Sequence, residues 1–137
     1  MSKLSREERM SLRFKVRPNQ TQRREHRLER EEIPLLLEQT HAKDPTLRKV
    51  AANNLCPCHI QGDVPEVWER LLEMTKDPDP KVRSTVLHAL TDGSPRERSE
   101  EIYSTIEQMY HDPDRKLRRR VRSLLAQARQ KGSINLG

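Results

Sequence analysis

KDPDPKVRSTVLHAL, residues 76–90, combines an Asp-Pro turn, a proline at the start of a helix, and apolar residues at helical spacing. The same pattern stands upstream as AKDPTLRKVAANNL, residues 42–55, and downstream as HDPDRKLRRRVRSLL, residues 111–125. Equivalent positions are 35 residues apart in both steps, as in Arg48, Arg83 and Arg118, or Leu55, Leu90 and Leu125. A fixed period of this length predicts a stack of repeated helical units.

Each repeat is expected to be a pair of antiparallel helices joined by the Asp-Pro turn. Asp44, Asp79 and Asp114 are the expected N-caps of the second helices. The first helices are expected to begin near Glu31, at Asp63, and at the capping box Ser94-Pro95-Arg96-Glu97. The predicted fold is therefore all-α: a short right-handed α-solenoid of about three helical hairpins over residues 31–131. A basic arm, residues 1–30, precedes it, and a tail, residues 132–137, follows it.

The composition suits layered helices better than one compact core, because 35% of the chain is charged and only 32% is hydrophobic. The net charge of +6 is unevenly distributed. Residues 1–30 hold ten Lys/Arg and four Glu, residues 31–114 hold nine basic and seventeen acidic residues, and residues 115–131 hold eight basic residues and no acidic ones. Two basic ends of this kind contact nucleic acid or an acidic membrane surface, or they attract the acidic middle of the same or another molecule. We favour the second interpretation.

The period, with D-P-D-x-x-V-R at the turn, resembles the HEAT-repeat family of α-solenoids over about Ile33 to Leu125. The resemblance implies a binding scaffold, usually for proteins. It also implies a ladder between stacked repeats, in which an Asp at the turn hydrogen-bonds an Arg six residues later. The matching pairs are Asp77 with Arg83 and Asp112 with Arg118. The first repeat keeps Arg48 but has Ala42 in place of the Asp, as suits a terminal repeat with no preceding neighbour.

Cys56-Pro57-Cys58-His59 is the most distinctive local motif. Its thiolates and imidazole could contribute to a zinc or soft-metal site, with a further ligand from His41, His88 or another chain. Alternatively, Cys56 packs as a small apolar residue at the end of a helix and Cys58 turns the loop. We favour packing, and expect no cofactor and no bound zinc.

No nucleophile–base pair and no phosphate-binding loop is visible, so an enzyme is not expected. The favoured function is a protein-interaction scaffold whose bound face is formed by the second helices, with Arg48, Lys81 and Arg119 pointing outward. Its partner would be another protein or an acidic surface of a second copy. The alternative is a nucleic-acid-associated protein that grips phosphates with the arm and the last helix. The basic patch on that helix is Arg115, Lys116, Arg119, Arg120 and Arg122.

Too few aromatic residues are present to stack on bases, which argues against the recognition of single-stranded nucleic acid. The sequence also has no apolar run of the length of a signal peptide or a membrane span. We therefore expect a soluble cytoplasmic protein without a membrane partner.

Overall fold

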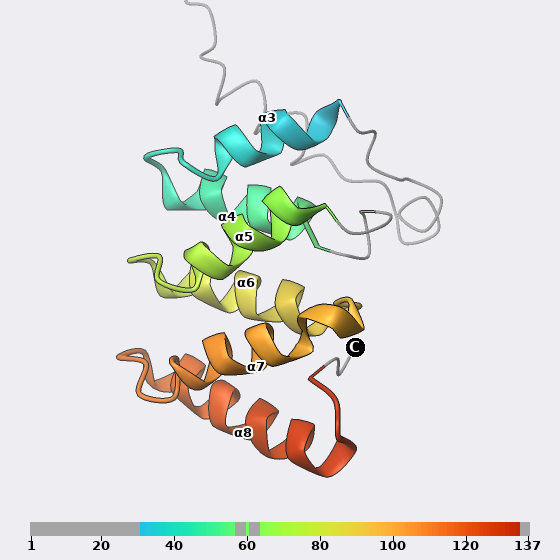
Figure 1. Cartoon of the computed structure of the whole chain (residues 1–137). Coiled ribbons are helices and arrows are strands. Elements are labelled where there is room, and N and C mark those ends of the chain that lie inside the picture. Colours follow the sequence, from blue (N-terminus) through green and yellow to red (C-terminus); the bar gives the residue numbers. More distant parts are fainter. Residues whose placement is uncertain (1–30, 57–59, 61–63, 135–137) are drawn as a thin grey trace, which may run out of the picture.

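The structure is a computed structural model that describes residues 31–56, 60 and 64–134. The predicted arm, Cys58, His59 and Asp63 lie outside these residues. Figure 1 shows the helices as a stack, from α3 at one end to α8 at the other, with the three Asp-Pro turns on one side. The elements of the described part are α3 (Glu32–Gln39), α4 (Pro45–Asn54), α5 (Pro65–Met74), α6 (Pro80–Thr91), the 3₁₀ turn η1 (Arg96–Arg98), α7 (Ser99–Glu107) and α8 (Arg115–Lys131).

The second helices begin where the sequence predicts, each behind an aspartate that caps it. The carboxylate of Asp44 accepts from the N–H of Thr46 at 2.8 Å, and that of Asp79 from the N–H of Lys81 at 2.8 Å. Asp114 accepts from the N–H of Leu117 at 2.9 Å. These bonds satisfy backbone donors that have no partner within the helix. The three caps are confirmed.

α3 begins at Glu32, as predicted, but the other two first helices begin differently from the prediction. α5 starts at Pro65 with Val64 as its N-cap, and the side chain of Val64 cannot cap it. The capping box at Ser94 is wrong, because Pro95 is extended (φ −64°, ψ 142°) and the chain then forms η1 before α7 starts. A 3₁₀ turn of this kind is frequent at a helix start. The hydroxyl of Ser94 is buried and has no partner in the described part of the chain.

The core lies between the layer of first helices and the layer of second helices. The fully buried side chains include Leu36, Leu71 and Ile106 on the first helices, Leu90 on α6, and Leu55 at the C-cap of α4. α4 packs against α6 more extensively than any other two helices do. Both helices carry fully buried alanines, and small side chains allow helix axes to approach closely.

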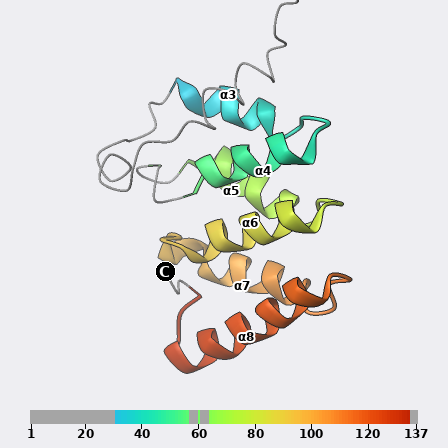
Figure 2. The ribbon, with the colours of Figure 1, turned by 180° about the vertical axis from the view of Figure 1, so that it is seen from behind.

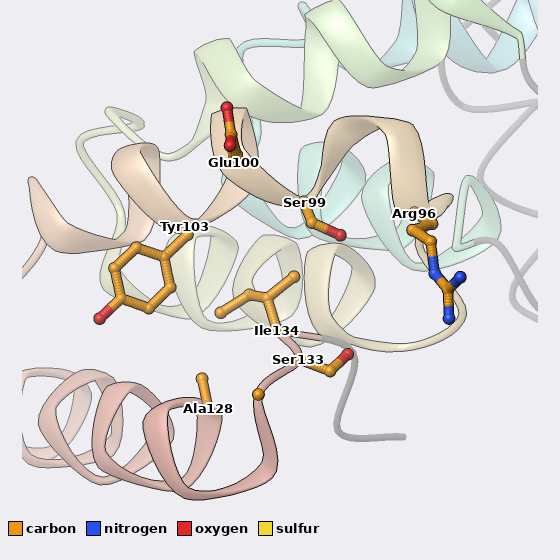
Figure 3. Close-up of a pocket in the computed structure, with 8 residues that line it drawn as sticks. Arg96, Ser99, Glu100, Tyr103, Ala128, Ser133 and Ile134 are labelled. Carbon is orange, nitrogen blue, oxygen red and sulfur yellow. The ribbon is translucent and has the colours of Figure 1, made fainter.

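The chain beyond α8 folds back onto the last hairpin. Gly132 ends α8 with a left-handed conformation (φ 74°), and its N–H donates to the carbonyl of Ala128 at 2.8 Å. Ile134 is then buried, at 3% exposure. Figure 3 shows it between Ala128 of α8 and the start of α7, where it lines a pocket of about 520 Å³. The sequence predicts only a tail for residues 132–137, so the burial of Ile134 against the last hairpin was not predicted.

Candidate binding surface on the second helices

The arginines at the 35-residue period line the side of the stack that carries the turns. In Arg48, Nε and Nη2 donate to the two carboxylate oxygens of Asp77, at 2.9 and 3.1 Å. In Arg83, the same two atoms donate to Asp112, both at 2.9 Å. Each carboxylate belongs to the repeat that follows its arginine. Two bidentate pairs therefore connect consecutive repeats, and bidentate geometry is the strongest form of this interaction.

The remaining edge of each guanidinium binds the turn of its own repeat. Nη1 donates to the carbonyl six residues earlier: Arg48 to Ala42 at 2.9 Å, Arg83 to Asp77 at 2.7 Å, and Arg118 to Asp112 at 2.9 Å. The predicted pairing of Asp77 with Arg83 and of Asp112 with Arg118 was therefore wrong for the side chains. Of the aspartate six residues earlier, Arg83 and Arg118 hydrogen-bond only the backbone carbonyl, not the carboxylate.

This arrangement explains why Ala42 is tolerated. The position six residues before the arginine supplies a carbonyl to its own repeat, and any residue type has one. Its side chain is needed only to bind the arginine of a preceding repeat, and no repeat precedes α3 in the described part of the chain.

The ladder pairs are largely removed from water. The side chains of Arg83 and Asp112 are 9% and 4% exposed, and those of Arg48 and Asp77 are 14% and 6% exposed. The hydrogen bond from Arg48 to Asp77 raises the pKa of the guanidinium, against the opposing effect of burial. Both arginines are thus committed to the structure. Arg48, which was predicted to point outward, is not available to a partner.

The two layers of helices carry opposite charge. The second helices contain only basic charged residues, two in α4, two in α6 and eight in α8, and no Asp or Glu. The first helices contain eight glutamates and a single cation, Arg70. Arg70 is itself bound, because its Nε donates to Oγ1 of Thr40 at 2.8 Å. The net charge of long blocks of sequence does not reveal this contrast, because the block of residues 31–114 contains helices of both layers. The net charge of each single helix does reveal it.

Solvent-accessible residues, all polar except Val50, form one stripe on each second helix, repeated at the 35-residue period. We call these three stripes together the second-helix face. It consists of Thr46, Lys49, Val50 and Asn53 on α4; Lys81, Ser84, Thr85 and His88 on α6; and Lys116, Arg119, Arg120 and Ser123 on α8. All of these residues are exposed or half-buried, and the spacing i, i+3, i+4, i+7 places each set on one side of its helix. Nη1 of Arg120 donates to Oγ of Ser84 at 3.0 Å, so the stripes of α6 and α8 are neighbours. Figure 2 shows the stack from behind.

The basic patch predicted on the last helix is divided among different surroundings. Arg120 donates to Ser84 of α6, while the neighbouring ladder residue Arg118 binds the turn. Arg122 lies over the ring of Tyr110, with its guanidinium carbon 4.2 Å from the ring centroid, and its Nε donates to the carbonyl of Tyr110 at 3.1 Å. Arg115, Lys116 and Arg119 are exposed. Arg122 is exposed as well, so four of the five predicted patch residues face solvent and Arg120 is half-buried. That this patch binds phosphate stays a prediction.

A family model for HEAT repeats matches residues 33–126, about two thirds of the chain. The chain belongs to the HEAT-repeat family. No curated protein sequence and no solved structure matches it significantly. HEAT repeats generally act as protein-interaction modules and are typically not enzymes. The helices in the described part of this HEAT solenoid lack the combination of length and apolar character that a membrane span requires.

Cys56 lies at the end of the first HEAT repeat, just after α4. It is buried at 2% exposure, and its Sγ is 3.6 Å from Oδ2 of Asp92. His88 is beside the same carboxylate, with Nε2 3.4 Å from Oδ2. His41, the other histidine considered from the sequence, precedes α4 and is separated from Cys56 by the length of that ten-residue helix, about 15 Å. Asp92 was not among the predicted ligands, although one period of 35 residues places Cys56 beside Thr91, the neighbour of Asp92.

Proposed function

We propose that this HEAT solenoid is a non-enzymatic scaffold that binds an acidic protein segment on the second-helix face. One observation carries the proposal: the second helices carry basic residues without a single carboxylate, while the first helices carry almost only glutamates. The basic face has no acidic side chain within its own helices to neutralise it. A partner of opposite charge would supply that neutralisation.

The basic residues of the second helices differ in whether they are already paired, and this difference supports the proposal. Arg48 and Arg83 are held in ladder pairs. Lys49, Lys81 and Arg119 are exposed on the second-helix face instead. Charges arranged on one face steer an oppositely charged partner toward it and fix its register. Asn53 and Ser123, exposed between these cations, add hydrogen-bonding groups that suit a polypeptide backbone.

An acidic polypeptide fits this face better than nucleic acid does. Binding to single strands uses aromatic rings that stack on bases. Tyr110 is the one large hydrophobic side chain that is well exposed in the described part, and Arg122 lies over its ring. The cations of the face are also interspersed with neutral residues, whereas a duplex grip needs several phosphate contacts at once. Nucleic acid is therefore the second candidate, favoured only by the density of arginine on α8.

The test compares two double variants that change the net charge equally. In the first, Lys81→Glu with Arg119→Glu, both changes lie on the second-helix face. In the second, Lys43→Glu with Lys76→Glu, both changes lie at exposed positions in the turns. A fluorescent peptide of about twenty residues rich in Asp and Glu is titrated into the full chain, and a duplex DNA of matched charge is titrated in parallel. We expect the face variant to lose at least about tenfold in peptide affinity, equal to about 1.4 kcal/mol, and the turn variant to lose much less.

Two results would count against the proposal. Equal losses in both double variants would show that the peptide responds to net charge and not to a site. Duplex binding tighter than peptide binding, with log K falling by about 0.9 per phosphate for each unit of log salt, would favour the nucleic-acid alternative.

A further inference from the structure

Three side chains with metal-ligating atoms meet where α4 and α6 end. They are Cys56, which follows α4, His88 in the last turn of α6, and Asp92 at the C-cap of α6. Their sulfur, nitrogen and oxygen atoms all lie within 4.8 Å of one another. We propose that these residues form a binding site for a tetrahedral transition-metal ion, with Zn²⁺ as the favoured occupant. The site shares His88 with the second-helix face, but the inference does not require the partner proposed for that face.

The distances match the edges of a tetrahedral zinc site. With Zn–S of about 2.3 Å and Zn–O and Zn–N of about 2.0–2.1 Å, tetrahedral angles place sulfur and oxygen about 3.5 Å apart, and nitrogen and oxygen about 3.3 Å apart. The observed distances are 3.6 Å from Sγ of Cys56 to Oδ2 of Asp92, and 3.4 Å from Nε2 of His88 to the same oxygen. The sulfur-to-nitrogen edge has only to close to about 3.5 Å. The imidazole can make that movement, because the side chain of His88 is 54% exposed.

The ligand set selects the class of metal. A thiolate and an imidazole suit zinc and other late transition metals, whereas Mg²⁺ and Ca²⁺ are bound by oxygen atoms. Three protein ligands leave the fourth tetrahedral position open to water or to an external ligand. The three residues come from two consecutive repeats, so a bound ion would link those repeats.

The repeat register shows that the fold does not require these residue types. At the period of 35, Cys56 corresponds to Thr91 and Ala126, and His88 corresponds to Asn53 and Ser123. Asp92 corresponds to Pro57 and Gln127. The other repeats thus form the same helices without a thiol, an imidazole or a carboxylate at these positions. The three groups occur together only at the junction of the first two repeats.

The site lies at the opposite end of α4 from the ladder. Arg48 and Asp77 join the first two repeats beside the turns. Cys56, His88 and Asp92 would join the same repeats at the far ends of α4 and α6. The sequence alone favoured a packing role for Cys56, because the partners of its thiol are 32 and 36 residues away along the chain. Its burial fits packing as well, but burial does not bring an imidazole and a carboxylate to the sulfur.

The test uses the full chain after treatment with a chelator, and Co²⁺ as a spectroscopic probe for Zn²⁺. We expect one Co²⁺ to bind per chain, with a near-ultraviolet thiolate-to-cobalt absorption band that Zn²⁺ abolishes. Cys56→Ser should lose the band. His88→Gln and Asp92→Asn should each weaken Co²⁺ binding at least about tenfold, since losing even a supporting group costs metal sites this much. His41→Gln changes an exposed histidine outside the site and should bind Co²⁺ as the unmodified chain does.

A stability measurement gives a second readout. Zn²⁺ at about 100 times its Kd should raise the folding equilibrium constant about 100-fold if it binds only the folded chain. At the same Zn²⁺ concentration the rise should fall to about 10-fold or less in His88→Gln. The side chain of His88 is half-exposed, so this variant should fold. The proposal is overturned if the unmodified chain shows neither the band nor the stabilisation. It is also overturned if His88→Gln and Asp92→Asn both bind Co²⁺ with unchanged affinity.

Discussion

Arg83 and Lys81 stand two residues apart on α6, yet they belong to different regions of the molecule. Arg83 lies on the turn side of the stack, where its side chain is 9% exposed and bidentate to Asp112. Lys81 lies on the second-helix face and is exposed. The same contrast recurs on α4 between Arg48 and Lys49. The cations of one helix thus either pair with the next repeat or remain exposed on the surface. The position of the cation within the repeat determines which of the two it does.

The difference has an energetic basis. A buried cation is tolerated only with a partner of good geometry, and removing one member of such a pair leaves the other charge buried and uncompensated. An exposed cation is solvated, and an ion pair at the surface contributes little to stability. Substitutions in the ladder should therefore lower stability, whereas substitutions of the exposed cations on the second-helix face should change only binding.

The largest expected effect is that of Arg83→Ala. The variant leaves the carboxylate of Asp112 and the carbonyl of Asp77 without their shared donor at the junction of the second and third repeats. We expect a loss of about 3 kcal/mol in the free energy of unfolding, measured by urea denaturation. Lys81→Ala is the matched control on the same helix and should stay within about 0.5 kcal/mol of the unmodified chain. Similar losses in the two variants would remove the distinction between the two regions.

A smaller effect is expected for Arg118→Ala, the third arginine at the ladder position. Arg118 donates to the carbonyl of Asp112 but to no carboxylate in the described residues, and its side chain is half-buried. Losing that hydrogen bond should cost about 1 kcal/mol in urea denaturation. A loss of stability as large as that of Arg83→Ala would mean that the pairing of Arg83 with the carboxylate of Asp112 contributes nothing. The hydrogen bond from the arginine to the backbone carbonyl would then account for the whole stabilisation.

The fold could be predicted from the sequence because each repeat carries nearly the same pattern of residue types. Apolar positions and capping aspartates recur at one period in all three repeats, and a proline follows the capping aspartate in the first two. A wrong assignment in one repeat is therefore corrected by the others. The start of α7 has no such support. The capping box at Ser94 is a local signal, and extended Pro95 separates it from the helix that begins at Ser99.

The ladder partners could not be read from spacing alone. Asp77 lies six residues before Arg83 and 29 residues after Arg48, so both arginines are candidates for its carboxylate. Only the stacking of the repeats shows that the carboxylate binds Arg48 and the carbonyl binds Arg83. The meeting of Cys56 with His88 and Asp92 also depends on stacking. Ile134 was missed for another reason, since a short segment beyond a glycine carries no periodicity.

The proposed binding face is tested most directly by a residue-resolved map of the bound peptide. Backbone amide chemical shifts of the full chain are recorded by NMR as the acidic peptide is added. We expect the largest changes within the three stripes of the second helices, residues 46–53, 81–88 and 116–123. Changes concentrated on α3, α5 and α7, or on the turns that hold the ladder, would contradict the assignment of the basic second-helix face as the binding surface.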